Sequence, residues 1–200
     1  MKLMSSIVVL LFVVALVACT ATASPGQGEP TLAEVRALTE RFQDVDIALA
    51  EGYIRDPFDL CDTAEMMGRP ASQGAMGVHY VRPDLLGITE PPSPRVNGVG
   101  IHTDFRKPSI LIYEPQADGS MELVAVENLV FAEAWRAAGN TERPSFHGVP
   151  YDSMIDDPTT AADEAHRFRA ALRSARLDLS RQSERRLHAV QSCRHLRAPP

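Results

Sequence analysis

The chain has 200 residues, of which 44% are hydrophobic, and a formal net charge of −6. This length and composition suit one globular domain with a hydrophobic core. Residues 1–166 carry 11 Lys and Arg against 24 Asp and Glu, an acidic excess that nucleic-acid phosphates would repel, so nucleic acid is not an expected partner.

The first residues, MKLMSSIVVLLFVVALVACTATASP, have the pattern of a signal peptide. One lysine precedes an apolar run from Ile7 to Ala18 that is short for a membrane span, and small residues follow. Leu16-Val17-Ala18-Cys19 resembles the lipobox of bacterial lipoproteins, which favours a leader over 1–18 and a lipid on Cys19. The Ala21–Ala23 stretch also fits ordinary signal peptidase, with a leader over 1–23.

Both alternatives predict an exported protein. With lipid on Cys19, the protein is anchored to the membrane of the cell envelope; without it, the protein is soluble in the periplasm or secreted. Export permits disulfides, and Cys61 and Cys193 remain once Cys19 is lipidated or removed. Cys61 is therefore a disulfide candidate, with two thiols that never meet as the alternative.

The expected elements begin after a Gly- and Pro-rich tether over 19–30. Residues 31–34, Thr-Leu-Ala-Glu, form a capping box that starts a helix. Its apolar positions recur every three to four residues and the helix is expected to stop at Gly52. These positions are Leu32, Val35, Leu38, Phe42, Val45 and Leu49. Residues 53–73 are expected to be irregular, with a short helical turn at 62–67.

Strands are expected next. GAMGVHYV (74–81) is typical of a strand, and 83–108, with five prolines, predicts a long surface loop. The runs 108–115 and 121–130, separated by an Asp-Gly turn, predict a β-hairpin. FAEAWRAAG (131–139) predicts a short helix, and an irregular segment follows it.

A helix followed by antiparallel strands predicts an α+β domain over 31–166. The N-terminal helix is expected to pack on a small antiparallel sheet, with long Pro-rich loops on the surface.

The order GY…C…GAMGVHYV…LIYEP…DG…LVAVE…W, within about residues 35–166, resembles a family of exported bacterial proteins whose activity is not established. Members of that family continue through a Tyr-x-Leu-His-Val-Trp strand, then Asn-Pro-x-Gly, then Asn-Pro-x-Val-x-Cys. This chain has none of these motifs after Phe168. The resemblance implies that the family's terminal cysteine reaches the position of Cys61, and no such bridge is expected from Cys193.

Residues 167–200 form an anomalous basic tail, with 9 Lys and Arg against 2 Asp and Glu. Read one base later, permitted codons for 173–178 encode Asp-Leu-His-Val-Trp. Arginine outnumbers lysine 18 to 2, which indicates a GC-rich gene in which out-of-frame reading yields arginine. We hypothesise that the tail is a frameshift product, biological or from sequencing.

The alternative is that the tail is genuine and forms an amphipathic helix in contact with anionic lipid or a partner. Its apolar stripe would be Phe168, Ala171, Leu172, Ala175 and Leu179. The segment is therefore expected to be helical or disordered.

His79, Glu114 and Glu127 are the polar residues within the three expected strands, and alternation puts them on one face. An imidazole and two carboxylates suit a divalent transition metal. The alternatives are hydrogen-bonded structural groups, or a buried carboxylate acting as general acid or base. His102, His147 and His166 lie in expected loops without ligand spacing, and no phosphate loop or G-x-S-x-G elbow is present.

The sequence therefore predicts an exported, lipoprotein-like domain that binds a small ligand or a divalent metal. The competing functions are an envelope enzyme that uses the same carboxylates, and a structural or partner-binding lipoprotein. No pattern in the sequence specifies a reaction, a ligand or an oligomeric state.

Overall fold

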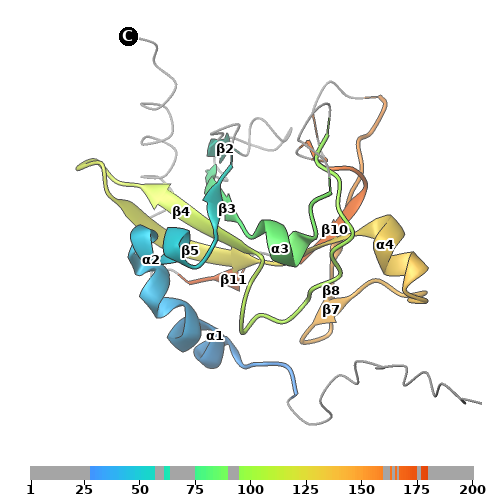
Figure 1. Cartoon of the computed structure of the whole chain (residues 1–200), viewed down its shortest axis with the longest axis horizontal. Coiled ribbons are helices and arrows are strands. Elements are labelled where there is room, and N and C mark those ends of the chain that lie inside the picture. Colours follow the sequence, from blue (N-terminus) through green and yellow to red (C-terminus); the bar gives the residue numbers. More distant parts are fainter. Residues whose placement is uncertain are drawn as a thin grey trace, which may run out of the picture.

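A six-stranded antiparallel sheet is the largest element of the molecule (Figure 1). Its strands follow the order β1-β3-β4-β5-β11, and β2 also pairs with β3. In this computed structural model the described residues are 28–56, 61–63, 75–89, 95–159, 163, 165, 167–174 and 177–179. The strands are β1 (Ile54–Arg55), β2 (Cys61–Thr63), β3 (Ala75–Val81), β4 (Ile110–Pro115), β5 (Met121–Glu127) and β11 (Leu177–Asp178).

A three-stranded sheet continues directly from the large one, because a single residue, Asn128, separates β5 from the next strand. Its order is β6-β10-β9. The bounds are Leu129–Phe131 (β6), Asp152–Met154 (β9) and Ala171–Arg173 (β10), and a separate two-stranded sheet pairs Ser145–Phe146 (β7) with Val149–Pro150 (β8). With a few short helices beside these sheets, the structure confirms the predicted α+β fold.

The N-terminal helix begins at the predicted residue, but it is interrupted and does not continue as one helix to Gly52. Thr31 caps α1 (Leu32–Thr39), donating from its backbone N–H to Glu34 at 2.7 Å and accepting from the Glu34 N–H at 3.2 Å. A 3₁₀ turn, η1 (Glu40–Gln43), follows, and the extended Asp44 then caps α2 (Val45–Ala50). An aspartate that bonds its own downstream backbone competes with helix continuation, which explains the break.

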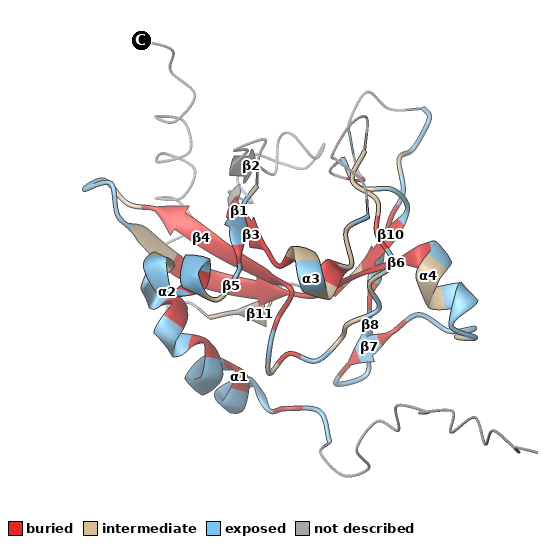
Figure 2. Ribbon diagram, viewed as in Figure 1, coloured by how far each residue is buried: buried red, intermediate tan, exposed pale blue. Residues whose placement is uncertain are grey.

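This break changes which face of the segment is buried. Val35, Phe42 and Ala48 pack against the sheet, whereas Leu32 and Leu49 of the predicted apolar stripe are exposed. Figure 2 shows the outer side of α1 and α2 as exposed, over a buried β4 and β5. The prediction of one apolar stripe is therefore wrong in part.

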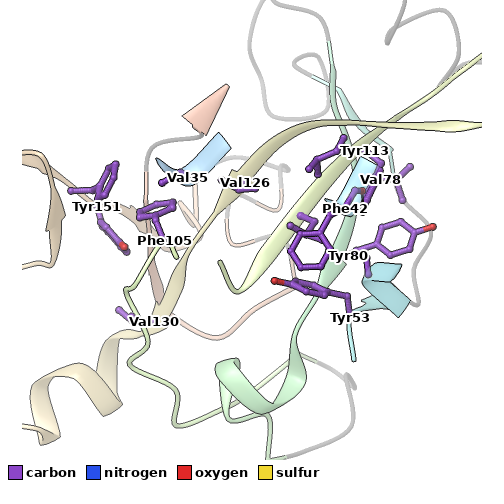
Figure 3. Packing of buried hydrophobic residues seen from close by; sticks show 14 of the residues in the cluster. Val35, Phe42, Tyr53, Val78, Tyr80, Phe105, Tyr113, Val126, Val130 and Tyr151 are labelled. Atoms are coloured by element: carbon purple, nitrogen blue, oxygen red, sulfur yellow. Dashed lines mark hydrogen bonds between the residues drawn. The ribbon is translucent and has the colours of Figure 1, made fainter. Parts of the chain in front are cut away.

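The predicted hairpin is confirmed as β4 and β5, with the Gln116 N–H donating to the Ser120 carbonyl at 2.8 Å across the turn. All of β4 is buried, so the large sheet has an apolar core on each face. On the α1 side, Phe42 packs on Tyr53 and Tyr80 packs on Tyr113, as Figure 3 shows. α3, β6, β9 and β10 supply residues to the core on the other face.

Of the predicted loop over 83–108, the structure describes 83–89 and 95–108, and these parts are more buried than expected. The segment begins with a short helix, α3 (Pro83–Leu86), which starts on a proline as helices tolerate. Leu86 and Phe105 are fully buried. Gly100 then passes so close to α3 that a β-carbon there would lie 2.4 Å from the Leu86 carbonyl oxygen. The Pro- and Gly-rich composition of the segment does not predict this burial.

Three other segments differ from expectation or match it in part. Residues 61–63 form strand β2 rather than the start of a helical turn, while 64–67 lie outside the described residues. The segment expected to be irregular after residue 139 contains β7, β8 and β9. The short helix is confirmed as α4 (Ala132–Ala137). Within the described residues, no helix is long and apolar enough to cross a membrane.

The first part of the basic tail forms strands, not a helix. Ala171 of β10 is opposite Phe131 of β6 on one side and Met154 of β9 on the other, and β11 pairs with β5. Leu172 is buried in the core on the α1 side. A strand between β6 and β9 pairs with the edges of both, which a helix on the surface would leave without a partner, and this tertiary pairing overrides helix propensity. Residues 180–200 lie outside the described part of the chain.

Candidate functional site

The three residues predicted to form a site do share one face of the large sheet. His79 is opposite Ile112 and Glu127 is opposite Ile110, while Glu114 follows two residues after Ile112 on the same strand. Side chains two residues apart on a strand point to the same side. His79 is partly exposed, and both glutamates are buried.

The pairing register of β3, β4 and β5 also shows that these three residues lie far apart along that face. Glu127 is level with Ile110 and Glu114 lies four residues further along β4, which is about 13 Å of strand. Two ligands of one metal ion are much closer than that. Among the described residues, no group of three or more His, Cys, Asp or Glu is arranged to hold a metal ion. The geometry thus does not support the predicted metal site at His79, Glu114 and Glu127.

A cation from the tail stands beside Glu127 instead. The Arg173 Nε lies 3.8 Å from Glu127 Oε2. The Glu127 side chain is 1% exposed and that of Arg173 is 20% exposed. Oε2 has no hydrogen-bond partner among the described residues. A carboxylate this deeply buried is tolerated when an opposite charge lies nearby, and Arg173 supplies that charge.

The next residue, Asn128, ties three strands together. Its side-chain Oδ1 accepts from the Ser109 N–H at 2.8 Å, just before β4. Its backbone N–H donates to Ser174 Oγ at 2.9 Å, and the Ser174 N–H donates back to the Asn128 carbonyl at 2.9 Å, just after β10. This buried network fixes the point at which the chain passes from β5 into β6, which is a structural role.

Tyr151 is buried in the core on the α1 side of the sheet, next to the Asn128 side chain. Burial raises the pKa of its phenol above the usual range, so it stays protonated and neutral. The Asn128 side chain faces this hydroxyl and lowers the pKa in part, against the larger effect of burial. Neither residue lines a pocket described below.

The loop histidines make local contacts rather than a site. His102 Nε2 lies 2.7 Å from the Lys107 carbonyl oxygen and so closes its own loop. The His147 Nε2 lies 2.9 Å from the Pro30 carbonyl oxygen, which joins the β7–β8 turn to the tether. His166 lies outside the described residues.

The cysteine predictions stay predictions. Cys61 begins β2 and is opposite Val78 of β3. Cys19 and Cys193 lie outside the described residues.

Arg82 is a buried cation with a bidentate partner. Its Nε and Nη2 donate to the two carboxylate oxygens of Asp84 at 2.8 and 2.7 Å, and its guanidinium lies over the Tyr53 ring. The hydrogen bond from Arg82 is the main cause that lowers the pKa of the Asp84 carboxyl. The arginine is almost fully buried while the aspartate is largely exposed. The pair therefore lies at the surface beside Tyr53 and β1, and we assign it a structural role.

We expect Asp84→Asn to lower the free energy of unfolding at pH 7 by about 1 kcal/mol or less, because water screens the exposed aspartate. The folded-state pKa of Asp84 lies below its unfolded value, so the aspartate stabilises the fold fully above about pH 4 and loses this effect as pH falls through the folded pKa. Urea unfolding at pH 7, 5 and 3 should show the difference from wild type shrinking only at the lowest pH. A difference that does not change with pH would contradict this assignment.

A pocket of about 740 Å³ lies between α4 and the segments around 95–99 and 165–170. We call it the α4 pocket. Phe131 and Phe168, with ring centroids 6.3 Å apart, and Gly98 supply an apolar part of its wall. A β-carbon on Gly98 would lie 2.4 Å from the Phe131 ring, so only glycine fits there. This volume is in the range of small-molecule sites.

Charged side chains surround the apolar wall. They are Arg95, Arg136, Arg169, Glu133 and Asp156. Arg95 already contacts two carboxylates, that of Asp156 through Nη2 and that of Asp163 through Nη1 at 3.0 Å. Within the described residues, Arg136 and Arg169 have no ion-pair partner. Among the described residues, the pocket therefore combines aromatic surface with two guanidiniums that pair with no carboxylate, and with one exposed carboxylate, Glu133.

The backbone around this pocket is well connected. The Val96 N–H donates to the Arg167 carbonyl at 2.8 Å, and the Arg169 N–H donates to the Val96 carbonyl at 2.9 Å. Gly100 accepts from the Phe131 N–H at 3.1 Å. These bonds hold the wall segments to each other and to β6, so the pocket is preformed.

Neither a protein-family model nor a curated protein nor a solved structure matches this chain. The resemblance to a family of exported proteins thus stays a prediction.

No pattern in the sequence indicates the α4 pocket. Its lining comes from four segments between residues 95 and 170, and no local motif joins them. The one available signal was the cluster of arginines that begins at Arg167, which was interpreted as an out-of-frame product.

Proposed function

We propose that this chain is an exported, lipid-anchored domain that binds a small ligand with an apolar body and an anionic group in the α4 pocket. The observation that carries the proposal is the combination, in one cavity, of an aromatic wall and two guanidiniums that pair with none of the described carboxylates. The aromatic rings would pack on the apolar body, and Arg136 and Arg169 would pair with the anion. The leader sequence and Cys19 support export and anchoring.

Binding of naphthalene-2-sulfonate and of its neutral counterpart 2-naphthol tests the proposal by titration calorimetry. We expect the sulfonate to bind with one-to-one stoichiometry and more tightly than the naphthol. Arg136→Gln and Arg169→Gln should each weaken sulfonate binding about fivefold, the effect of one solvent-accessible ion pair, and leave naphthol binding unchanged. Lys107→Gln removes one exposed cation that does not line the pocket and serves as the control.

A second pair of variants tests the apolar wall. Ala134 lines the pocket from α4, so Ala134→Trp should fill it and abolish binding of both probes. Ala117→Trp places the same side chain on the exposed β4–β5 turn and should leave both affinities unchanged. Equal losses in Ala134→Trp and Ala117→Trp, or equal effects of the three charge variants, would place the probes elsewhere and reject the proposal.

A further inference from the structure

The segment that precedes α1 is fixed to the domain by three hydrogen bonds. Arg106 Nη2 donates to the Gly28 carbonyl at 2.7 Å. The His147 backbone N–H donates to Glu29 Oε2 at 2.8 Å, and the His147 ring nitrogen Nε2 lies 2.9 Å from the Pro30 carbonyl oxygen. The last three residues of the predicted tether are therefore docked on the domain beside α1.

An apolar groove opens beside these residues. It has a volume of about 640 Å³ and lies between the start of α1, the β7–β8 turn and β11. We call it the α1 groove, and Figure 1 shows α1 and the β7–β8 pair on the same side of the large sheet. Leu32, at 47% exposed, and Val149, at 52% exposed, are the large apolar side chains most open to solvent in it.

Arg36 is the charged side chain at the edge of the groove, and none of the described carboxylates lines it. Glu29 accepts from the His147 N–H and its Oε2 lies 3.8 Å from His147 Nδ1, and Glu34 accepts from Thr31 in the capping box. An apolar groove with an arginine at its edge matches the interface of a bilayer, where acyl chains lie beneath phosphate groups.

The number of residues between Cys19 and Gly28 limits the distance between a lipid on Cys19 and the α1 groove. Between Cys19 and Gly28 the chain can extend about 30 Å at most. A lipid on Cys19 would therefore hold the α1 groove close to the membrane. Apolar contact and attraction to anionic headgroups could then act at a high local concentration of lipid.

We propose that the α1 groove rests on the phospholipid surface of the membrane that carries the Cys19 anchor, with Leu32 and Val149 at the level of the acyl chains. This inference depends on the lipid anchoring contained in the proposed function. It adds an orientation: the β4–β5 turn, at the far end of the sheet from β8 in Figure 1, faces away from the bilayer.

Single-tryptophan variants of the full lipidated protein test this orientation. Trp135 is the only tryptophan, so Trp135→Phe gives a silent background. In that background, Val149→Trp reports on the groove and Ala117→Trp on the β4–β5 turn. The proteins are reconstituted in vesicles of phosphatidylcholine with phosphatidylglycerol, with and without bromine on the acyl chains. We expect the brominated lipid to quench Val149→Trp at least twofold and Ala117→Trp hardly at all.

The outcomes separate the two proposals. A chain that does not float with vesicles has no anchor, and both the anchoring and the docking are then rejected. A chain that floats but shows equal quenching at the two positions is anchored without this orientation, and only the docking is rejected. Circular dichroism melting checks each fold, and Leu32→Trp in the same background replaces Val149→Trp should the latter not fold.

Discussion

Arg173→Met is expected to lower the free energy of unfolding by about 3 kcal/mol. The substitution keeps the aliphatic length of the side chain but removes the cation 3.8 Å from Glu127 Oε2, which leaves a carboxylate that is 1% exposed without its counter-charge. Removing one partner of a buried ion pair typically costs about 3–5 kcal/mol. The lower end applies here because Arg173 keeps some contact with water.

Urea unfolding at pH 7, followed by circular dichroism, measures this loss. Arg169→Met is the matched control: it removes an exposed arginine of the same segment and should change the free energy of unfolding by less than about 0.5 kcal/mol. Adding Glu127→Leu to Arg173→Met should restore most of the stability, because no buried charge is then left. Equal stabilities of Arg173→Met and Arg169→Met would show that Arg173 does not compensate Glu127.

The same experiment bears on the origin of the tail. The frameshift hypothesis holds that residues after 166 were never selected to pack on this sheet. In the structure, Arg173 compensates a buried glutamate and Ser174 completes the Asn128 network, which are specific contacts for a segment of accidental sequence. Sequencing the gene across codons 160–175 is the direct test of the reading frame. A large effect of Arg173→Met would show that the printed frame already supplies structural contacts.

Elements with a local cause were the ones that the sequence could predict. The hairpin follows from two apolar runs around Asp118-Gly119, and Gly119 has the positive φ of 86° that such a turn requires. The start of α1 follows from the Thr31–Glu34 capping box. In both cases residues within a few positions of each other contain the full signal.

The features that the sequence could not predict depend on contacts between segments that are far apart in the chain. Helix propensity predicted a helix after Phe168, but β6 and β9 offered two strand edges that only the folded chain brings together. Alternation placed His79, Glu114 and Glu127 on one face correctly, yet could not give their positions along it, because register depends on how the strands pair. The α4 pocket, built from four segments, was outside the reach of any local pattern.

Gly100→Ala is expected to lower the free energy of unfolding by about 2–3 kcal/mol. A β-carbon at Gly100 would lie 2.4 Å from the Leu86 carbonyl oxygen and 2.5 Å from that of Leu85, and backbone atoms of a helix cannot give way as a flexible side chain can. The clash would also strain two bonds: Gly100 donates to the Leu86 carbonyl at 2.9 Å and accepts from the Phe131 N–H at 3.1 Å.

Because Phe131 forms part of the wall of the α4 pocket, this substitution connects stability with binding. The affinity for naphthalene-2-sulfonate should fall in Gly100→Ala even at temperatures where the variant is fully folded. Gly28→Ala is the control, since a β-carbon there meets no atom within 4 Å and the residue is far from this pocket in sequence. A folded Gly100→Ala that binds the sulfonate as wild type does would mean that the segment around 95–100 moves independently of the wall, and the α4 pocket would then not be the preformed site on which the proposed function depends.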